Sequence, residues 1–145
     1  MKRLSMFLLG IMFVGFAVFA TQFNELPGYP PFIELDVRGQ ETMPIKITRG
    51  EVLKIWGTFE TRYEMYSARL RCNLTTAGIT FPLNDIDVDL LNASFPVPAG
   101  SRLNILIEIP FYYYPLMDGM ELDIMIDDHL FTPVVGASLD CSIVE

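Results

Sequence analysis

Residue types that commonly carry catalysis and metal binding are scarce in this 145-residue chain, which has one histidine and two cysteines. The histidine, His129, stands beside Asp127 and Asp128, but no Gly-x-Ser-x-Gly motif supplies the nucleophile of a Ser-His-Asp triad. A zinc site needs three or four converging Cys, His or carboxylate ligands, and this chain offers too few. We therefore expect no enzyme, no metal site and no cofactor, and we interpret residues 127–129 as a solvated acidic loop.

Calcium and phosphate motifs are also missing. Asp85, Asp87 and Asp89 are spaced like the start of an EF-hand loop, and no glycine-rich phosphate loop occurs. The EF-hand needs Gly at its sixth position and Glu at its twelfth, where this chain has Leu90 and Pro96. Since aliphatic residues alternate with the three aspartates, the pattern indicates an exposed strand face, with a distorted calcium site as the alternative.

The chain has one long apolar run, close to its N-terminus. Lys2 and Arg3 precede the apolar residues 6–19, which are fewer than the roughly 20 that span a bilayer. Val18 and Ala20 fit a small-residue cleavage site. We therefore expect residues 1–20 to be a signal peptide and the protein to be secreted, into the extracellular space or a lysosomal lumen.

Basic residues are few, ten against 18 acidic ones. Removal of Lys2 and Arg3 leaves eight basic residues, so residues 21–145 carry a net charge of −10. Such a charge repels nucleic-acid phosphates and anionic lipid surfaces. We expect no nucleic-acid partner.

No helical stripe is present, and apolar residues alternate with polar ones after residue 30. The alternating runs are 33–37, 45–47, 51–61, 68–74, 79–83, 103–109, 122–126 and 139–143. Turn signals lie near or between them, at Arg38-Gly39, Arg49-Gly50, Ala77-Gly78, Ala99-Gly100, Asp118-Gly119 and Val135-Gly136. Seven or eight short strands predict one all-β domain over residues 21–145, a β-sandwich with a single apolar core. The proline-rich residues 23–31 are expected to form a stiff extended lead-in.

Aromatic residues are plentiful in one segment, Phe111-Tyr112-Tyr113-Tyr114-Pro115, and they are joined by Phe81 and Phe95. These residues are either ordinary core with a tyrosine-rich loop, or the lining of a lipid pocket, since such pockets are mostly apolar. In a secreted chain the sequons at Asn73 and Asn92 become credible glycosylation sites.

Several motifs, in order, resemble the MD-2-related lipid-recognition (ML) domain family, especially its Niemann–Pick type C sterol-carrier branch. The similar segments are 32–37, Met43-Pro44-Ile45, Arg49-Gly50, Ala68, Phe81-Pro82, Phe95-Pro96-Val97, Ile109-Pro110, Tyr114-Pro115, Asp127-Asp128 and Leu139-Asp140-Cys141. The family usually has three disulfides. Here only Cys141 matches, while Ile45 and Phe95 stand where cysteines are expected.

The resemblance implies an immunoglobulin-like β-sandwich of two antiparallel sheets with an internal apolar lipid cavity. Carried over residue by residue, the sterol carriers' pocket falls on Phe81, Phe111 and Tyr114. Ile79 shares the predicted inward face of Phe81, and Ile124 stands where the sterol carriers have tryptophan, so both are included among the expected lipid-binding residues.

The function expected is therefore that of a secreted carrier of a sterol, a fatty-acid-like molecule or another neutral lipid, with possible docking to a membrane or receptor. Two alternatives are a lipid-sensing co-receptor of an innate-immune type and a plain immunoglobulin-like interaction module with a filled core.

The two cysteines give conflicting indications. A secreted protein should pair Cys72 with Cys141. The family's strand order instead places the strand 120–126 between them, so their Cα atoms would be about 9–10 Å apart at a strand spacing of about 4.8 Å. A disulfide needs them within about 7 Å. The sequence therefore leaves two alternatives for Cys72 and Cys141: two free, buried thiols or one disulfide.

Overall fold

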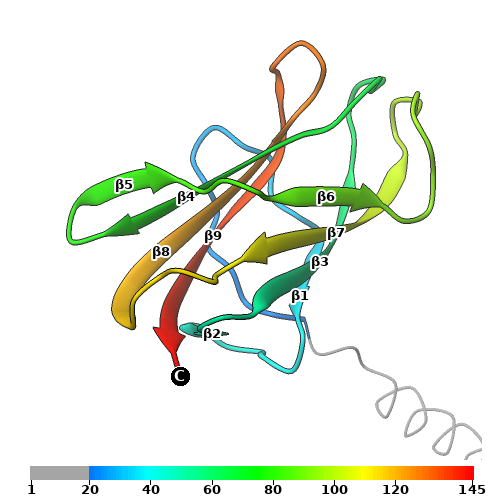
Figure 1. Ribbon diagram of the computed structural model, residues 1–145. Helices are drawn as coiled ribbons and strands as arrows, with labels where there is room; N and C mark the ends of the chain where they lie inside the picture. The colour runs from blue at the N-terminus through cyan, green and yellow to red at the C-terminus, as the bar shows by residue number, and fades with distance from the viewer. Residues whose placement is uncertain (1–19) are drawn as a thin grey trace, which may run out of the picture.

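The computed structural model describes residues 20–145, which form two β-sheets stacked face to face and contain no helix (Figure 1). The expected signal peptide, apart from Ala20, lies outside the described residues. The fold is all-β, as predicted, with nine strands rather than seven or eight: β1 (Glu34–Val37), β2 (Ile45–Thr48), β3 (Val52–Glu60), β4 (Arg69–Thr76), β5 (Ile79–Pro82), β6 (Asp87–Leu90), β7 (Arg102–Pro110), β8 (Met117–Asp127) and β9 (Pro133–Val144).

One sheet has four strands in the order β1-β3-β7-β6, and the other has five in the order β2-β9-β8-β4-β5. Every pairing is antiparallel except that of β2 with β9, which is parallel. The expectation of two purely antiparallel sheets is therefore wrong at this one pair. The physical reason is the connection over residues 38–44, which carries the chain from β1 in one sheet to β2 in the other and delivers β2 in the direction of β9.

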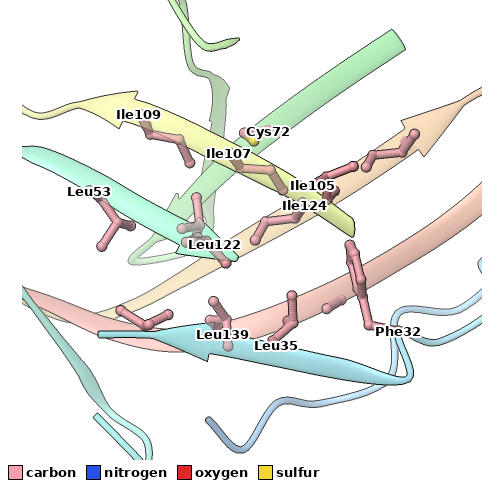
Figure 2. Close-up of a cluster of buried hydrophobic side chains, with 14 of the residues drawn as sticks. Phe32, Leu35, Leu53, Cys72, Ile105, Ile107, Ile109, Leu122, Ile124 and Leu139 are labelled. Carbon is pink, nitrogen blue, oxygen red and sulfur yellow. The ribbon is translucent and has the colours of Figure 1, made fainter. Parts of the chain in front are cut away.

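The core lies between the sheets because alternate side chains of each strand point inward. In the central β3–β7 pair, Leu53 faces Ile109 and Ile55 faces Ile107, and all four side chains are buried. Figure 2 shows such side chains meeting between the sheets from β1, β3, β4, β7, β8 and β9. Full burial of one large aliphatic side chain contributes about 1.5–3 kcal/mol, so this layer is the main source of stability.

The inward face begins with Phe32 rather than with Ile33. The regular strand starts only at Glu34, and the ring of Phe32 contacts Phe59 edge to face, at a centroid distance of 6.0 Å. Gly57 makes room for this ring, since a Cβ there would lie 2.9 Å from Phe32 Cε1. Ile33 is consequently exposed, contrary to the alternation that placed it inward.

Two predicted turns lie within strands. Gly136 is inside β9, where a Cβ would come within 2.8 Å of the Tyr29 side chain, so glycine serves close packing there. Gly119 lies in β8, where the pairing with β9 shifts register between Met117 and Met120, as expected of a β-bulge.

The segment before β1 joins the two sheets along one edge. Thr21 donates its backbone N–H to Leu35 O of β1 (2.7 Å), while Asn24 exchanges two backbone hydrogen bonds with Ser138 of β9. Pro31 also forms a bridge with Gly136. The predicted extended lead-in is therefore a clamp that closes this edge of the sandwich.

Asp127 and Asp128 are buried, so the interpretation of residues 127–129 as a solvated acidic loop is wrong for both carboxylates. Asp127 accepts hydrogen bonds from Tyr29 Oη (2.7 Å) and Arg71 Nε (3.0 Å). Burial and the neighbouring Asp127 carboxylate raise the pKa of Tyr29. Partners distant in sequence thus compensate the cost of burying this carboxylate. Only His129 of the three is exposed.

Both cysteines are free and buried. β8 lies between the strands that carry them, as the family's strand order implied. Cys72 faces Ile124, which faces Ala137, so Cys141 is also displaced four residues along β9. Two strand spacings and four residues correspond to about 16 Å between the Cα atoms, well beyond disulfide reach.

We predict that neither thiol reacts with an alkylating reagent in the native protein and that both react after denaturation without reductant. Burial raises the pKa of Cys72 and of Cys141 to about 12, so only about one thiol in ten thousand is ionised at pH 8. Mass spectrometry of the alkylated protein counts the labels. A mapped Cys72–Cys141 disulfide, or rapid native labelling, would contradict the structure.

Candidate functional site

One edge of the sandwich lacks the clamp that closes the other. β6 ends the four-stranded sheet and β5 ends the five-stranded sheet, and residues 83–86 cross between them (Figure 1). Partly buried apolar side chains gather along this open edge, from β4, β5, β6, the residues that directly precede β4 and β6, and the β7–β8 loop: Ala68, Leu70, Phe81, Ile86, Val88, Leu90 and Tyr114. The apolar interior therefore reaches the surface at this edge.

An aromatic cluster lies at the end of the open edge where β7 finishes. The Phe81 and Tyr114 rings stack with centroids 6.5 Å apart, and the Phe111 and Tyr114 centroids are 5.3 Å apart. Phe111 is fully buried and is held by backbone hydrogen bonds with Gly50 and Glu51, whereas Phe81 and Tyr114 are half-buried. The structure thus brings together the three aromatic residues that the resemblance selected.

The two aliphatic residues expected beside them are placed differently. Ile79 is 65% exposed, so its assignment to an inward face is wrong. It does lie on the same side of β5 as Phe81, but β5 is a short edge strand and its first residue extends beyond the core. Ile124 is fully buried between Cys72 and Ala137 in the centre of the five-stranded sheet.

A separate apolar pocket of about 50 Å³ lies between the sheets near the opposite end of the open edge. Residues of β3, β6 and β7 form one wall, and Ile126, Ala68 and Met65 form the other; the full lining is Phe59, Met65, Ala68, Val88, Leu90, Phe95, Leu103, Ile105 and Ile126. Phe95 is the exposed member of this lining. The pocket is much smaller than the roughly 300–1,000 Å³ of ligand sites, so in this structure it is too small to hold the lipid that the resemblance implies.

Sequence reasoning did not assign this pocket. Its signal is Ala68, a small residue at an inward position between the larger Met65 and Leu70. Because alanine leaves the facing side chains of β6 and β7 without a full partner, a void remains there.

The sequons lie on outer surfaces. Asn73 is half-buried on the outer face of β4, between inward-facing Cys72 and Leu74. Asn92 is exposed after β6, where its Nδ2 donates to Arg102 O (3.0 Å) and its Oδ1 accepts from Asn104 N (2.9 Å).

Within residues 20–145, no group of three or more His, Cys, Asp or Glu side chains is arranged to hold a metal ion. In the same part of the chain, no helix is long and apolar enough to cross a membrane. The open edge therefore offers apolar surface and aromatic rings, which suit an uncharged apolar ligand.

No family model matches the chain, and no curated protein matches it in sequence. Among solved structures, a Niemann-Pick type C2 protein from Japanese carpenter ant matches with a TM-score of 0.70. The match covers 85% of this chain and 99% of that chain at 8% sequence identity. At this identity the similarity shows the fold alone, and it confirms the expected immunoglobulin-like β-sandwich.

We predict that Phe111→Ala lowers the free energy of unfolding by about 3–5 kcal/mol, because the ring is fully buried and its removal leaves a cavity. Tyr113→Ala is the matched control, since this neighbouring ring is 96% exposed and its removal should change stability by less than about 0.5 kcal/mol. Urea unfolding measures both variants. Equal losses would show that Phe111 does not support the core.

Proposed function

We propose that this protein is a non-catalytic, secreted carrier that binds a sterol or similar neutral lipid between its two sheets. The observation that carries the proposal is the open edge, where half-buried apolar side chains connect an apolar pocket at one end with the cluster of Phe81, Phe111 and Tyr114 at the other. The fold shared with a Niemann-Pick type C2 protein supports it.

A ligand of this size requires the sheets to part, because the pocket holds only about 50 Å³. Burial of about 400 Å² of apolar ligand surface contributes about 10 kcal/mol before ordering costs. Micromolar binding needs about 8 kcal/mol. The opening and the ordering of the ligand together can therefore cost about 2 kcal/mol before the affinity falls below the micromolar range.

The edges of the two sheets are suited to such a movement. β5 is paired only with β4, and β6 only with β7, so no strand-to-strand hydrogen bond joins the two sheets there. Parting them exposes side chains that are already partly hydrated. The free protein is then the closed state, and the lipid selects an open one.

A neutral ligand fits the charge of the protein. Residues 21–145 carry a net charge of −10, and no basic side chain lines the apolar pocket. Recognition of a lipid phosphate uses clustered Arg or Lys side chains. A secreted carrier with N-glycans at Asn73 and Asn92 is consistent with the outward placement of both sequons.

The small volume of the pocket favours one second candidate, an interaction module with a filled core. The two candidates differ in whether lipid accompanies the purified protein. Native mass spectrometry of protein secreted from eukaryotic cells should show one bound sterol-sized or fatty-acid-sized molecule, whereas a filled module would carry none.

We predict that an unlabelled sterol displaces half of a bound fluorescent sterol at a concentration at least tenfold lower than an acidic phospholipid or a lipopolysaccharide needs. The reason is repulsion by the acidic protein together with the lack of a basic pocket. Competition titrations in dilute detergent measure this ratio. An advantage of tenfold or more for the acidic lipids would rule out the neutral-ligand proposal.

We further predict that Ala68→Leu weakens sterol binding at least tenfold without destabilising the fold. The added side-chain atoms fill the pocket beside Val88 and Phe95, and filling a void with apolar atoms restores lost contacts. Ala99→Leu, at an exposed loop position outside the lining, should leave affinity unchanged. Equal affinities for the two variants would show that the ligand does not use this pocket.

A further inference from the structure

Three loops meet at the end of the sandwich where β7 begins, and Figure 1 shows them together at the upper side of the molecule. They are the β3–β4 loop (61–68), the β6–β7 loop (91–101) and the β8–β9 loop (128–132). Met65 and Val97 exchange two backbone hydrogen bonds that join the first two loops. The first and third loops line one shallow groove, which includes Tyr63 and Thr132.

Exposed apolar side chains are concentrated on these loops. Six of the eleven large hydrophobic residues that are exposed within residues 20–145 lie on these loops. One of them, Leu91, directly follows β6, and we refer to the other five together as the tip surface: Tyr63, Tyr66, Phe95, Leu130 and Phe131. Leu130 and Phe131 are 71% and 65% exposed and are adjacent at the end of the β8–β9 hairpin. Large apolar side chains gathered at one end of a protein and exposed to this extent suggest an interaction site.

The hairpin end is held rigidly by the buried carboxylate of Asp128. Its Oδ1 accepts the backbone N–H groups of Leu130 (2.8 Å) and Thr132 (2.9 Å), and its own N–H donates to Thr132 O (3.0 Å). Phe131 has φ +62°, a strained conformation for a bulky residue. The loop thus maintains a costly backbone geometry that presents two apolar side chains to solvent.

Flanking side chains fix the tip laterally. The Arg69 guanidinium lies 4.5 Å from the Phe131 ring centroid, and the Tyr66 and His129 rings pack edge to face at 5.0 Å. Tyrosine rings and an arginine around aliphatic and phenyl groups are the side chains typical of a membrane–water interface.

The loops that carry the tip surface also contain few charged residues, although the chain as a whole is acidic. The formal charges of the three loops are those of Arg62, Glu64 and the buried Asp128. The strong negative charge of residues 21–145 is therefore carried elsewhere, and this end can lose water against a neutral bilayer with few charged groups to desolvate.

We propose that the tip surface docks on a neutral lipid bilayer, with Leu130 and Phe131 inserted below the headgroups. The inference rests on the proposed function, because the apolar pocket lies directly beneath these loops. Met65, Ala68 and Phe95 belong both to the loops and to the pocket lining. A docked bilayer would therefore adjoin the apolar interior at the place where the sheets can part.

A bilayer fits better than a protein partner, because the two side chains that project at the hairpin end, Leu130 and Phe131, are strongly exposed and carry no hydrogen-bonding group. The Asn92 side chain is held by hydrogen bonds to the backbone of Arg102 and Asn104 in β7, so a glycan there would be attached beside β7 and not on the β8–β9 hairpin.

Flotation with phosphatidylcholine vesicles tests the docking. The tip variant is Leu130→Gln with Phe131→Asn, since asparagine tolerates a positive φ. The matched control is Leu116→Gln with Tyr113→Asn, which removes two exposed apolar side chains from the β7–β8 loop at the opposite end. We expect the tip variant to lose at least tenfold in bound fraction and the control less than twofold, with wild-type binding retained in about 0.5 M salt.

Unfolding midpoints and solution binding of a fluorescent sterol should be unchanged in both variants. Failure of the wild-type protein to float, or equal flotation of the tip variant, overturns the docking. Dimerisation that only the tip variant abolishes, without flotation, assigns the surface to a second copy. Flotation without any sterol binding in solution overturns the proposed function alone, and sterol binding without flotation overturns the docking alone.

Discussion

The packing of aliphatic side chains between β3 and β7 on one side and β8 and β9 on the other is the interaction on which the structure depends. No disulfide joins the sheets within residues 20–145, since both cysteines are free. The central strands therefore hold the sandwich together by burial alone, with Ile55, Ile107, Ile124 and Leu139 fully buried (Figure 2). Such packing is dense, and each methylene group removed from it lowers the free energy of unfolding. The centre of the sandwich is therefore rigid, and structural differences between one side and the other occur at the edges.

The edges differ in what reinforces this core. On one side the segment before β1 bonds to β1 through Thr21 and to β9 through Asn24, so backbone hydrogen bonds connect the two sheets. On the other side the two sheets are connected by the short crossing 83–86 and by apolar side chains, many of which are only partly buried. Local stability follows such contacts. The pocket and the aromatic cluster lie on the less reinforced side, whereas the tip surface lies at the end of the sandwich, where its loops also adjoin Gly28 and Pro30.

Much of the fold was predictable from the sequence, because alternation of apolar residues and alternation of burial have the same period in a strand. Leu103, Ile105, Ile107 and Ile109 show this directly, since all four are buried in β7. The prediction failed where burial depends on a distant partner. Asp127 was read as solvated because Tyr29 and Arg71, which bind it, lie far from it in sequence.

The same division applies to single glycines. The sequence predicts a turn at Gly136, but the need for glycine there comes from the Tyr29 side chain of another segment. At Gly50 and Gly78, where positive φ values of 85° and 77° are local properties of a turn, the prediction is confirmed. Sequence patterns therefore predict local backbone geometry better than close approaches between segments.

The candidate site shows why its chemistry was easier to predict than its volume. Phe81, Phe111 and Tyr114 were selected by a resemblance in motif order, and they meet because β5 and the β7–β8 loop adjoin at one end of the sandwich. A void, in contrast, depends on what stands opposite each small residue. Ala68 leaves space only because Val88 and Leu90 of the other sheet do not fill it. The alternation of apolar residues along one strand does not tell which residues of the other sheet face them. Enlargement of this space is part of the proposed function, and the two sheets are joined by backbone hydrogen bonds on the clamped side only. Because Cys72 and Cys141 form no disulfide, the proposed separation on the other side would break apolar contacts and no covalent bond.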